Sequence, residues 1–341
     1  MKYAVVDLSN LFFSVRFATM GDADSQLGMA FHILFRSLKK LYKETHVDHI
    51  VFAVDYSSWR YTVYPAYKGK RKLDRLEKSL EDQEQDKMFM DAMNDLIDFL
   101  DKKTNCTVLK LYQIEADDFV AGWIQSHPND EHIIVSADSD FVQLLDKNVS
   151  IYDGVKNLHI TTNEITNIDG KKVSFEINTK NGKIKIGPVN NNFVPENDWW
   201  KKALFLKIIR GDIGDGIFPA YPKVRYNGSS KKVGICEAWE DRKSKGFDWN
   251  NFMLSEWQKP LIDGTIENVK VKDSFAFNEL LIDLTKQPDD IKQKMFEFIL
   301  EKSNKKNIKL INLHFLKFCG KYDLPQLAAE AIQHSDYLSK E

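Results

Sequence analysis

The sequence predicts an α/β fold in which a central, mostly parallel sheet is flanked by helices. Three short apolar runs support this prediction: YAVVD, HIVFAVD and HIIVSADSD. They lack the regular apolar–polar alternation of half-exposed strands, which is typical of strands buried on both faces of a parallel sheet. Helical patterns lie between the runs, and the order strand, helix, strand indicates a doubly wound layer structure.

The other elements follow along the chain. Residues 28–42 place apolar side chains on one helical face, and another helix opens at Glu115. The segment KKVSFEINTKNGKIKIGPV alternates around an Asn-Gly turn and predicts a β-hairpin near 172–186. Next, DWWKKALFLKIIRGDIGDGIF predicts a helix that ends at Gly211, and residues 249–340 are helical in pattern.

Length and composition are those of an ordinary globular protein. The 341 residues are 43% hydrophobic and 12% aromatic, enough for one large or two smaller domains. No apolar run approaches the roughly 18 residues that cross a bilayer, and the N-terminus lacks a cleavage site, so we expect neither a membrane span nor a signal peptide. Cys106, Cys236 and Cys319 are odd in number and far apart, which argues against a disulfide framework or a zinc site and favours a reducing cytoplasm.

The formal net charge of -2 hides a strong local asymmetry. Residues 60–78 contain seven basic residues and two acidic ones, whereas residues 79–101 contain eight acidic residues and one lysine. A sum near zero therefore does not exclude a polyanionic partner, because the positive charge is localised.

Acidic residues gather where the predicted strands end and helices begin. The carboxyl ends of parallel strands meet at one edge of a sheet, where ligands bind. Singly, each acid is also compatible with an N-cap, a helix first turn or a solvated turn. Seven acids lie at such positions: Asp7, Asp55, Glu115, Asp117, Asp118, Asp138 and Asp140. The GDIGDG segment adds Asp212 and Asp215.

Together these acids indicate a metal centre. Glu115 and Asp118 lie three positions apart and share a helical face, so they can converge on one point. Oxygen ligands without clustered histidine or cysteine suit Mg²⁺ or Mn²⁺ rather than zinc. Two such ions about 4 Å apart can clamp the attacking and leaving oxygens of a phosphodiester. We therefore expect a pair of Mg²⁺ ions, for which Mn²⁺ substitutes.

The segment WRYTVYPAYKGKRK interleaves basic and aromatic residues. Basic side chains neutralise backbone phosphates, and aromatic rings stack on unpaired bases. A solvated helix face with a few buried rings is the alternative, but Pro65 and Gly69 break a simple amphipathic helix here. We expect Arg60, Lys70 and Lys72 to contact nucleic acid.

Several segments, in this order, resemble the structure-specific 5′-nucleases: VVDLSN, VD followed by WRYTVYPAYKGKR, EADD, SADSDF and GDIGDGI. That family includes flap endonucleases, the 5′-exonuclease domains of bacterial DNA polymerases and the tailed-bacteriophage enzymes called ribonuclease H, which remove RNA primers. The resemblance covers most of the chain, since FNELLIDLTKQPDDI also matches a segment near the family's C-terminal end.

The resemblance implies two metal sites beside a helical arch. Lys68 and Arg71 match the basic pair that contacts the scissile phosphate from the base of the arch, and Tyr67 matches the stacking aromatic. The first metal would lie nearest Asp7, Asp55, Asp118 and Asp138, with Glu115 and Asp117 alongside. The second, more loosely held metal would lie near Asp140, Asp212 and Asp215.

The resemblance also implies the domain plan and the substrates. Residues 1–200 would form an α/β nuclease core, with the arch at about 60–95 and an inserted β-hairpin at about 155–197; residues 201–341 would form a helical duplex-binding region. A monomer in the cytoplasm, or in the host cytoplasm if the protein is viral, would cleave near 5′ ends at flaps, nicks and RNA–DNA hybrids during primer removal. Family habit adds a single-strand-binding protein and a sliding clamp as partners.

Three departures from the family pattern are visible. The segment GIFPAYPKVRYNGSSKK replaces a glycine-rich turn, which puts a monovalent-ion site in doubt. The insertion at about 155–197 has no family counterpart, and Ser14 stands where the family has an arginine, with Arg16 two residues later. Lys223, Arg225, Lys231 and Lys232 remain candidates for contacts with duplex phosphates.

Two other functions stay open: a catalytically inactive junction-binding scaffold, and a PIN-type ribonuclease, which needs only about four acids and no arch. The scaffold predicts erosion of the carboxylates, and all nine are present. The sequence leaves open the balance of exonuclease and flap-endonuclease activity and the preference for RNA or DNA.

Overall fold

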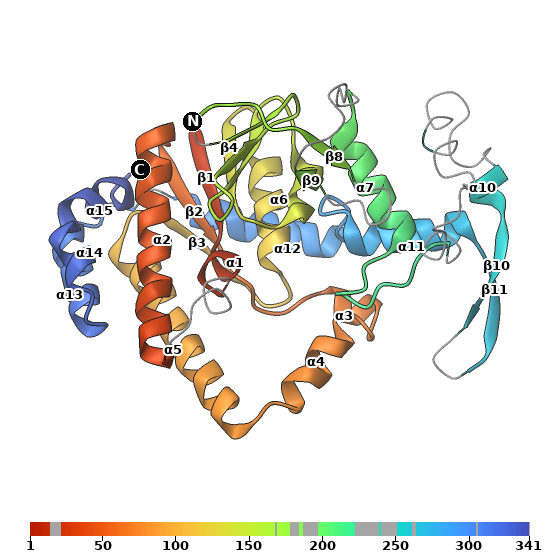
Figure 1. Cartoon of the computed structure of the whole chain (residues 1–341), viewed down its shortest axis with the longest axis horizontal. Coiled ribbons are helices and arrows are strands. Elements are labelled where there is room, and N and C mark those ends of the chain that lie inside the picture. The colour runs from red at the N-terminus through yellow and green to blue at the C-terminus, as the bar shows by residue number, and fades with distance from the viewer. Residues whose placement is uncertain are drawn as a thin grey trace.

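The computed structural model describes residues 1–13, 22–167, 169–177, 184–186, 197–221, 239, 251–260, 264–304 and 306–340. A seven-stranded sheet lies at its centre, in the order β3-β2-β1-β4-β5-β6-β7 (Figure 1). Neighbours from β3 to β5 are parallel, and β6 and β7 add antiparallel strands, which confirms the predicted α/β fold. The strands are β1 (Lys2–Asp7), β2 (His49–Ala53), β3 (Thr107–Leu109), β4 (Glu131–Val135), β5 (Val149–Asp153), β6 (Leu158–Ile160) and β7 (Ile165–Asn167).

Strand β1 occupies the point where the strand order reverses. It pairs with β2 on one side and β4 on the other, so that Val6 lies opposite both Phe52 and Val135. In open parallel sheets, a crevice forms outside the carboxyl ends of the strands at this point. Asp7 ends β1, and Asp138 follows β4 by three residues, so both lie at the mouth of the crevice.

Helices cover both faces of the sheet (Figure 1). The apolar side chains of α1, α2, α5 and α13–α15 form one core with the sheet, and those of α6, α7 and α12 form another on the opposite face. The bounds are α1 (Leu8–Phe13), α2 (Ala23–Thr45), α5 (Leu80–Lys103), α6 (Ala116–Ser126), α7 (Trp199–Arg210), α12 (Asp289–Lys302), α13 (Ile311–Lys321), α14 (Pro325–Ala329) and α15 (Ala331–Leu338).

Polar N-caps fix where two of the helices begin, and a glycine fixes where a third ends. The Asp22 carboxylate accepts a hydrogen bond from the Ser25 backbone N–H at 2.8 Å at the start of α2. The Ser79 hydroxyl accepts one from the Asp82 N–H at 3.1 Å at the start of α5. Helix α7 ends before Gly211, whose positive φ of 63° turns the chain, as the sequence predicts.

Below the sheet, two helices meet in a V that is open toward the strands (Figure 1). One arm is α4 (Gly69–Leu76), rich in lysine and arginine, and the other is the acidic α5. The short helix α3 (Arg60–Val63) connects the basic arm to the sheet. The basic stretch and the acidic stretch of the sequence therefore form the two different arms of this V, here called the arch.

The remaining elements lie beside this layer structure. Strands β8 (Phe175–Ile177) and β9 (Ile184–Ile186) pair antiparallel within the segment predicted as a hairpin. A second ribbon, β10 and β11, lies at the far end of the molecule beside α10 and α11 (Figure 1). Among the described residues, no helix is both long and apolar enough to cross a membrane. The bounds are β10 (Glu256–Pro260), β11 (Ile266–Lys270), α10 (Asn251–Leu254) and α11 (Val271–Ile282).

Candidate active site

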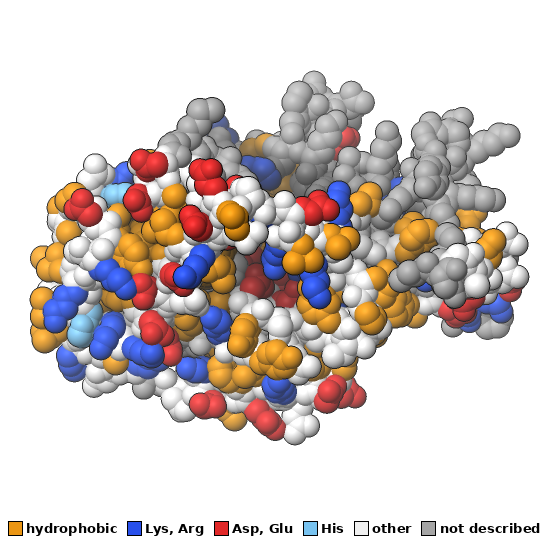
Figure 2. All heavy atoms as spheres, turned by 90° about the horizontal axis from the view of Figure 1, so that it is seen from below, with side chains coloured by type: hydrophobic (Ala, Val, Ile, Leu, Met, Phe, Trp, Pro, Cys, Tyr) orange, Lys and Arg blue, Asp and Glu red, His pale blue; other side chains and the backbone are white. Residues whose placement is uncertain are grey.

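A cleft of about 1140 Å³ opens at the carboxyl ends of the strands. Figure 2, viewed from below, shows acidic side chains at the bottom of a central hollow with basic side chains beside it. Among the described residues, seven aspartates line the cleft, and they come from segments spread over two hundred positions. They are Asp7, Asp55, Asp117, Asp138, Asp140, Asp212 and Asp215.

The deepest aspartate is Asp7, and its neighbours are acidic. Burial, together with the charges of Asp55 and Asp138, raises the pKa of Asp7 to about 7. Burial and the charges of Asp7, Asp55 and Asp138 also raise the pKa of Asp117 well above its usual range. In the described part of the chain, no lysine or arginine forms an ion pair with Asp7, Asp55 or Asp117. Among the described residues, Asp7, Asp55 and Asp117 therefore concentrate negative charge that no ion pair neutralises.

Hydrogen bonds hold these carboxylates in place. Asp7 accepts hydrogen bonds from the Asn10 N–H at 3.0 Å and the Ser136 hydroxyl at 3.3 Å. Asp55 accepts one from the Ala116 N–H at 2.9 Å, so its carboxylate lies at the positive N-terminus of α6. The same helix start carries Asp117, which brings these two carboxylates to one place.

The other half of the cleft contains its own cation. Lys207, from the last turn of α7, forms ion pairs with Asp140 and, at 3.1 Å, with Asp212. Burial would lower the pKa of Lys207, but these two carboxylates outweigh it and raise the pKa. For Asp212, burial would raise the pKa, but Lys207 outweighs it and lowers the pKa.

The GDIGDG segment is a tight loop built around Asp212. Its carboxylate accepts hydrogen bonds from the backbone N–H groups of Gly214 at 2.8 Å and Asp215 at 3.3 Å. Gly211 is required at the entry: a Cβ there would lie 2.4 Å from the Ile217 carbonyl oxygen, and the residue has a positive φ. The loop thus presents both aspartates to the cleft.

The base of the arch is joined to this loop. The Lys68 N–H donates to the Asp215 carbonyl oxygen at 2.8 Å, and Arg71 pairs with the Asp215 carboxylate at 2.9 Å. The Tyr67 hydroxyl donates to Asp215 and to Glu115, each at 3.2 Å. The Lys68 ammonium donates to Glu115 at 2.5 Å. Lys68 and Arg71 therefore line the cleft together with the aspartates.

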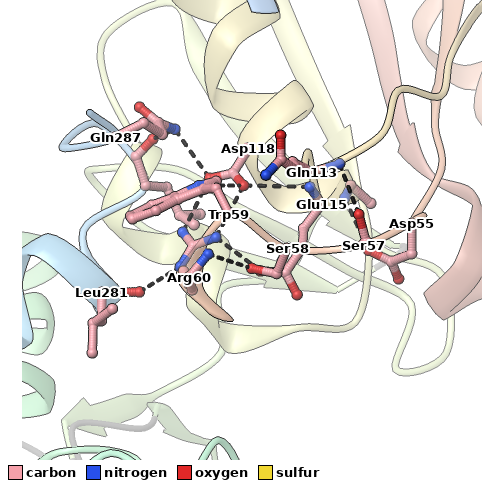
Figure 3. A network of polar contacts seen from close by, with 12 residues as sticks. Asp55, Ser57, Ser58, Trp59, Arg60, Gln113, Glu115, Asp118, Leu281 and Gln287 are labelled. Atoms are coloured by element: carbon pink, nitrogen blue, oxygen red, sulfur yellow. Dashed lines mark hydrogen bonds and ion pairs between the residues drawn. The ribbon is translucent and has the colours of Figure 1, made fainter. Parts of the chain in front are cut away.

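Behind the cleft lies a buried network centred on Arg60 (Figure 3). Its guanidinium donates to Glu115 at 2.8 Å, to both oxygens of Asp118 at 2.9 and 3.0 Å, and to the Leu281 carbonyl oxygen at 2.8 Å. Gln287 donates to the same Asp118 carboxylate at 3.2 Å. Burial would lower the pKa of Arg60, but Asp118 and Glu115 outweigh it and raise the pKa.

This network differs from the sequence expectation at three residues. Arg60 is only 2% exposed and its donors are occupied, so it holds carboxylates and does not face nucleic acid. Asp118 is fully buried and directed at Arg60, away from the cleft. Both carboxylate oxygens of Glu115 accept hydrogen bonds. Oε1 accepts from Lys68, and Oε2 accepts from Ser58, Arg60 and Tyr67. Glu115 and Asp118 do converge on one cation, but that cation is Arg60.

Tyr67 also differs from the expectation of a stacking aromatic. Its side chain is buried, with 4% exposure, and its hydroxyl holds two carboxylates. Lys70 and Lys72 are exposed on α4, where they can meet a phosphate. Lys223, Arg225, Lys231 and Lys232 lie outside the described residues, as do Ser14 and Arg16.

Sequence reasoning missed Lys207 and Gln287. Lys207 could have been found from the sequence, because it precedes Asp212 by five positions and lies in the last turn of a helix that leads into an acidic loop. Gln287 could not, since an isolated glutamine in a loop does not reveal a buried acidic partner.

The donor chemistry of the cleft fits hard divalent cations. The aspartates that line the cleft offer only oxygen, which Mg²⁺ and Mn²⁺ prefer. However, within the described ranges no group of three or more histidine, cysteine, aspartate or glutamate side chains is arranged so that it could hold a metal ion as it stands. The fit therefore rests on the donor chemistry of these aspartates and not on a preformed ligand geometry.

Comparisons with known proteins agree with the fold and match the first half of the chain to a family model. Residues 2–175 match the model of the 5′-3′ exonuclease N-terminal, resolvase-like domain. The fold is similar to that of the bacteriophage T5 5′-exonuclease with bound divalent zinc ions, at 16% identity and a TM-score of 0.57, covering 89% of this chain and 100% of that one. It is also similar to a variant of the bacteriophage T5 flap endonuclease in a complex with DNA and metal ions, at 17% identity and a TM-score of 0.54, covering 88% and 98%. No curated protein was found to match the sequence.

Proposed function

The chain belongs to the 5′-3′ exonuclease family, and we propose from this premise that it is a metal-dependent, structure-specific 5′-nuclease. It would hydrolyse phosphodiesters near the 5′ end of DNA or RNA strands at flaps, nicks and RNA–DNA hybrids. The role would be primer removal during lagging-strand replication. The observation that carries the proposal is the meeting of seven aspartates with Lys68 and Arg71 in one cleft.

Each group has a distinct task in this proposal. Asp7, Asp55, Asp117 and Asp138 would hold the first cation, and Asp140, Asp212 and Asp215 the second. Bound divalent cations supply Lewis-acid activation of water and of the phosphate. Lys68 and Arg71 stabilise the charge that develops on the phosphate in the transition state, since both line the cleft beside the carboxylates.

The buried network has a supporting task. Glu115 holds Lys68 by a 2.5 Å hydrogen bond, and Arg60 in turn holds Glu115. Because Arg60 also binds the Leu281 carbonyl, the base of the arch is fixed against the C-terminal part of the chain. A lysine placed in this way loses little conformational entropy when it meets the scissile phosphate.

The test is a Mg²⁺-dependent cleavage assay with three substrates: a 5′-flap, a nicked duplex and a structured RNA. We expect the wild type to cut the flap and the nicked duplex, and Asp138→Asn to lose cleavage while it still binds the flap. Wild-type binding without cleavage would instead favour the inactive scaffold. Cleavage of the RNA alone would favour the PIN-type ribonuclease, and full activity of Asp138→Asn would count against the metal centre.

A further inference from the structure

Two tyrosines with largely exposed rings lie next to the cleft but outside it. Tyr56 follows Asp55 directly in the chain, and Tyr112 lies in the loop between β3 and α6. Their side chains are 62% and 59% exposed, and the ring centroids are 5.9 Å apart at 76°. Isolated exposed aromatics are ordinary, but a pair from two separate loops forms a continuous aromatic surface.

A lysine flanks each ring. The Lys110 ammonium lies 5.5 Å from the Tyr56 ring centroid, and the Lys294 ammonium lies 5.8 Å from that of Tyr112. Lys110 donates to the neutral Asn94 side chain, and Lys294 to the Tyr112 carbonyl oxygen. Neither lysine has an ion pair with a carboxylate anywhere in the described ranges, so both positive charges remain available to an anion.

The two loops are held rigidly against each other. The Gln113 N–H donates to the Ser57 hydroxyl at 2.7 Å, and the Trp59 N–H donates to the Gln113 carbonyl oxygen at 2.9 Å. Gln113 itself has a positive φ of 71°, which is unfavourable for this residue type and is maintained by these bonds. The ring pair is therefore preformed, so little conformational entropy is lost when a ligand binds to it.

We propose that Tyr56, Lys110, Tyr112 and Lys294, here called the Tyr56–Tyr112 patch, bind single-stranded nucleic acid as it leaves the cleft. Bases stack on the tyrosine rings without sequence preference, and the two lysines neutralise backbone phosphates. The patch begins one residue from Asp55, which lines the cleft, so one strand can occupy both. The inference deepens the proposed function and rests on it for the identity of the polyanion.

The experiment compares two labelled probes by fluorescence anisotropy in EDTA, so that no cleavage occurs. One is a DNA hairpin with a 5′ oligo-thymidine arm, and the other is the same hairpin without the arm. We expect Tyr56→Ala/Tyr112→Ala to weaken binding of the armed hairpin about tenfold and to leave the bare hairpin unchanged. Tyr56→Phe/Tyr112→Phe keeps the rings and should bind the armed hairpin like the wild type.

The lysines are tested through salt dependence. Lys110→Ala/Lys294→Ala should reduce the slope of log Kd against log salt for the armed hairpin by about 1.4, or ~0.7 for each phosphate contact. Lys317→Ala, an exposed lysine on the distant helix α13, is the matched control and should change neither affinity nor slope.

Equal losses for both probes, or no loss for the armed hairpin, would overturn the assignment. Because binding is measured without metal, this result is independent of whether the wild type cleaves any substrate. If the wild type cleaves no substrate but the tyrosine variant still loses affinity for the armed hairpin, only the proposed function is contradicted. If the wild type cleaves but the tyrosine variant binds the armed hairpin normally, only the proposed role of the patch is contradicted.

Discussion

Arg60 donates hydrogen bonds to both carboxylate oxygens of Asp118, at 2.9 and 3.0 Å, in a site that water does not reach. The pair joins three parts of the chain that are far apart in sequence: the base of the arch, the start of α6 and the end of α11. Such a pair is costly to form, because both charges lose their hydration, but far more costly to break. The arrangement therefore makes the position of the arch base depend on one arginine.

Arg60→Met should destabilise the fold by about 3 to 5 kcal/mol, because it leaves the Asp118 charge buried without a cationic partner. Urea unfolding measures the effect. The double variant Arg60→Met/Asp118→Leu should regain part of the loss, since no unpaired charge remains. The exposed Arg75→Met is the control and should change stability by less than about 0.5 kcal/mol; a similar loss there would show that the effect is not specific to the buried pair.

The sequence was sufficient to predict the sheet and the edge where the acids gather. Apolar runs without alternation mark buried parallel strands, and the position of Asp7 at the end of the first run follows from chain direction alone. These are local properties, each readable within a few residues. The end of α7 at Gly211 is also a local property, because the positive φ that ends the helix is required at a single residue.

The sequence was not sufficient to assign each acid its partner. In EADD, the helical period places Glu115 and Asp118 on one face, but it does not say whether that face is turned to the cleft or to the interior. The answer depends on Arg60, fifty-five residues earlier, and on how α3 packs against α11. Burial of Tyr67 likewise follows from tertiary packing, since a tyrosine in a basic segment suits either a buried or a stacking role.

Lys207→Met should tighten divalent-cation binding at the second half of the cleft. Lys207 pairs with Asp140 and Asp212, so a cation that uses these carboxylates must displace it. Loss of this competitor should gain roughly 1 kcal/mol, or about fivefold in Kd, for the weaker site. Titration calorimetry with Mn²⁺ measures it, with Lys201→Met on the exposed side of the same helix as the control. Weaker binding in Lys207→Met would show that the lysine organises the carboxylates and does not compete for them.

Ionisation of Asp7 should destabilise the metal-free protein as the pH rises from about 4 to about 7, whereas the buried His334, whose pKa is lowered to about 4, acts in the opposite sense. Burial and two acidic neighbours raise the pKa of Asp7 to about 7, whereas an unfolded aspartate ionises near ~3.9. In this interval Asp7 binds more protons in the folded state than in the unfolded state, so rising pH weakens its contribution to stability, by about 4 kcal/mol. Unfolding in EDTA at several pH values, compared between the wild type and a variant without this carboxylate, measures the contribution.

Asp7→Asn should remove this contribution, because the side chain no longer ionises, so its stability relative to the wild type should rise from about pH 4 to about pH 7 and the metal-free variant should be the more stable protein above pH 7. The exposed Asp336→Asn is the control and should keep the wild-type dependence of stability on pH. Added Mg²⁺ should stabilise the wild type more than Asp7→Asn. If both variants retain the wild-type dependence, the acidic cluster around Asp7 does not govern it.

Gly211→Ala should separate damage to the acidic loop from damage to the fold. The new Cβ would lie 2.4 Å from the Ile217 carbonyl oxygen, at a residue whose φ of 63° disfavours alanine, so the loop must move and carry Asp212 and Asp215 with it. We expect a loss of about 1 to 3 kcal/mol in stability. Cleavage at saturating substrate should fall by more than the unfolded fraction explains.

Gly69→Ala is the matched control: its Cβ meets no atom within 4 Å and the residue has no positive φ, so the substitution should be neutral or slightly stabilising. If Gly211→Ala retains both stability and activity, the loop can accommodate the added methyl group. In that case Gly211 does not fix the positions of Asp212 and Asp215.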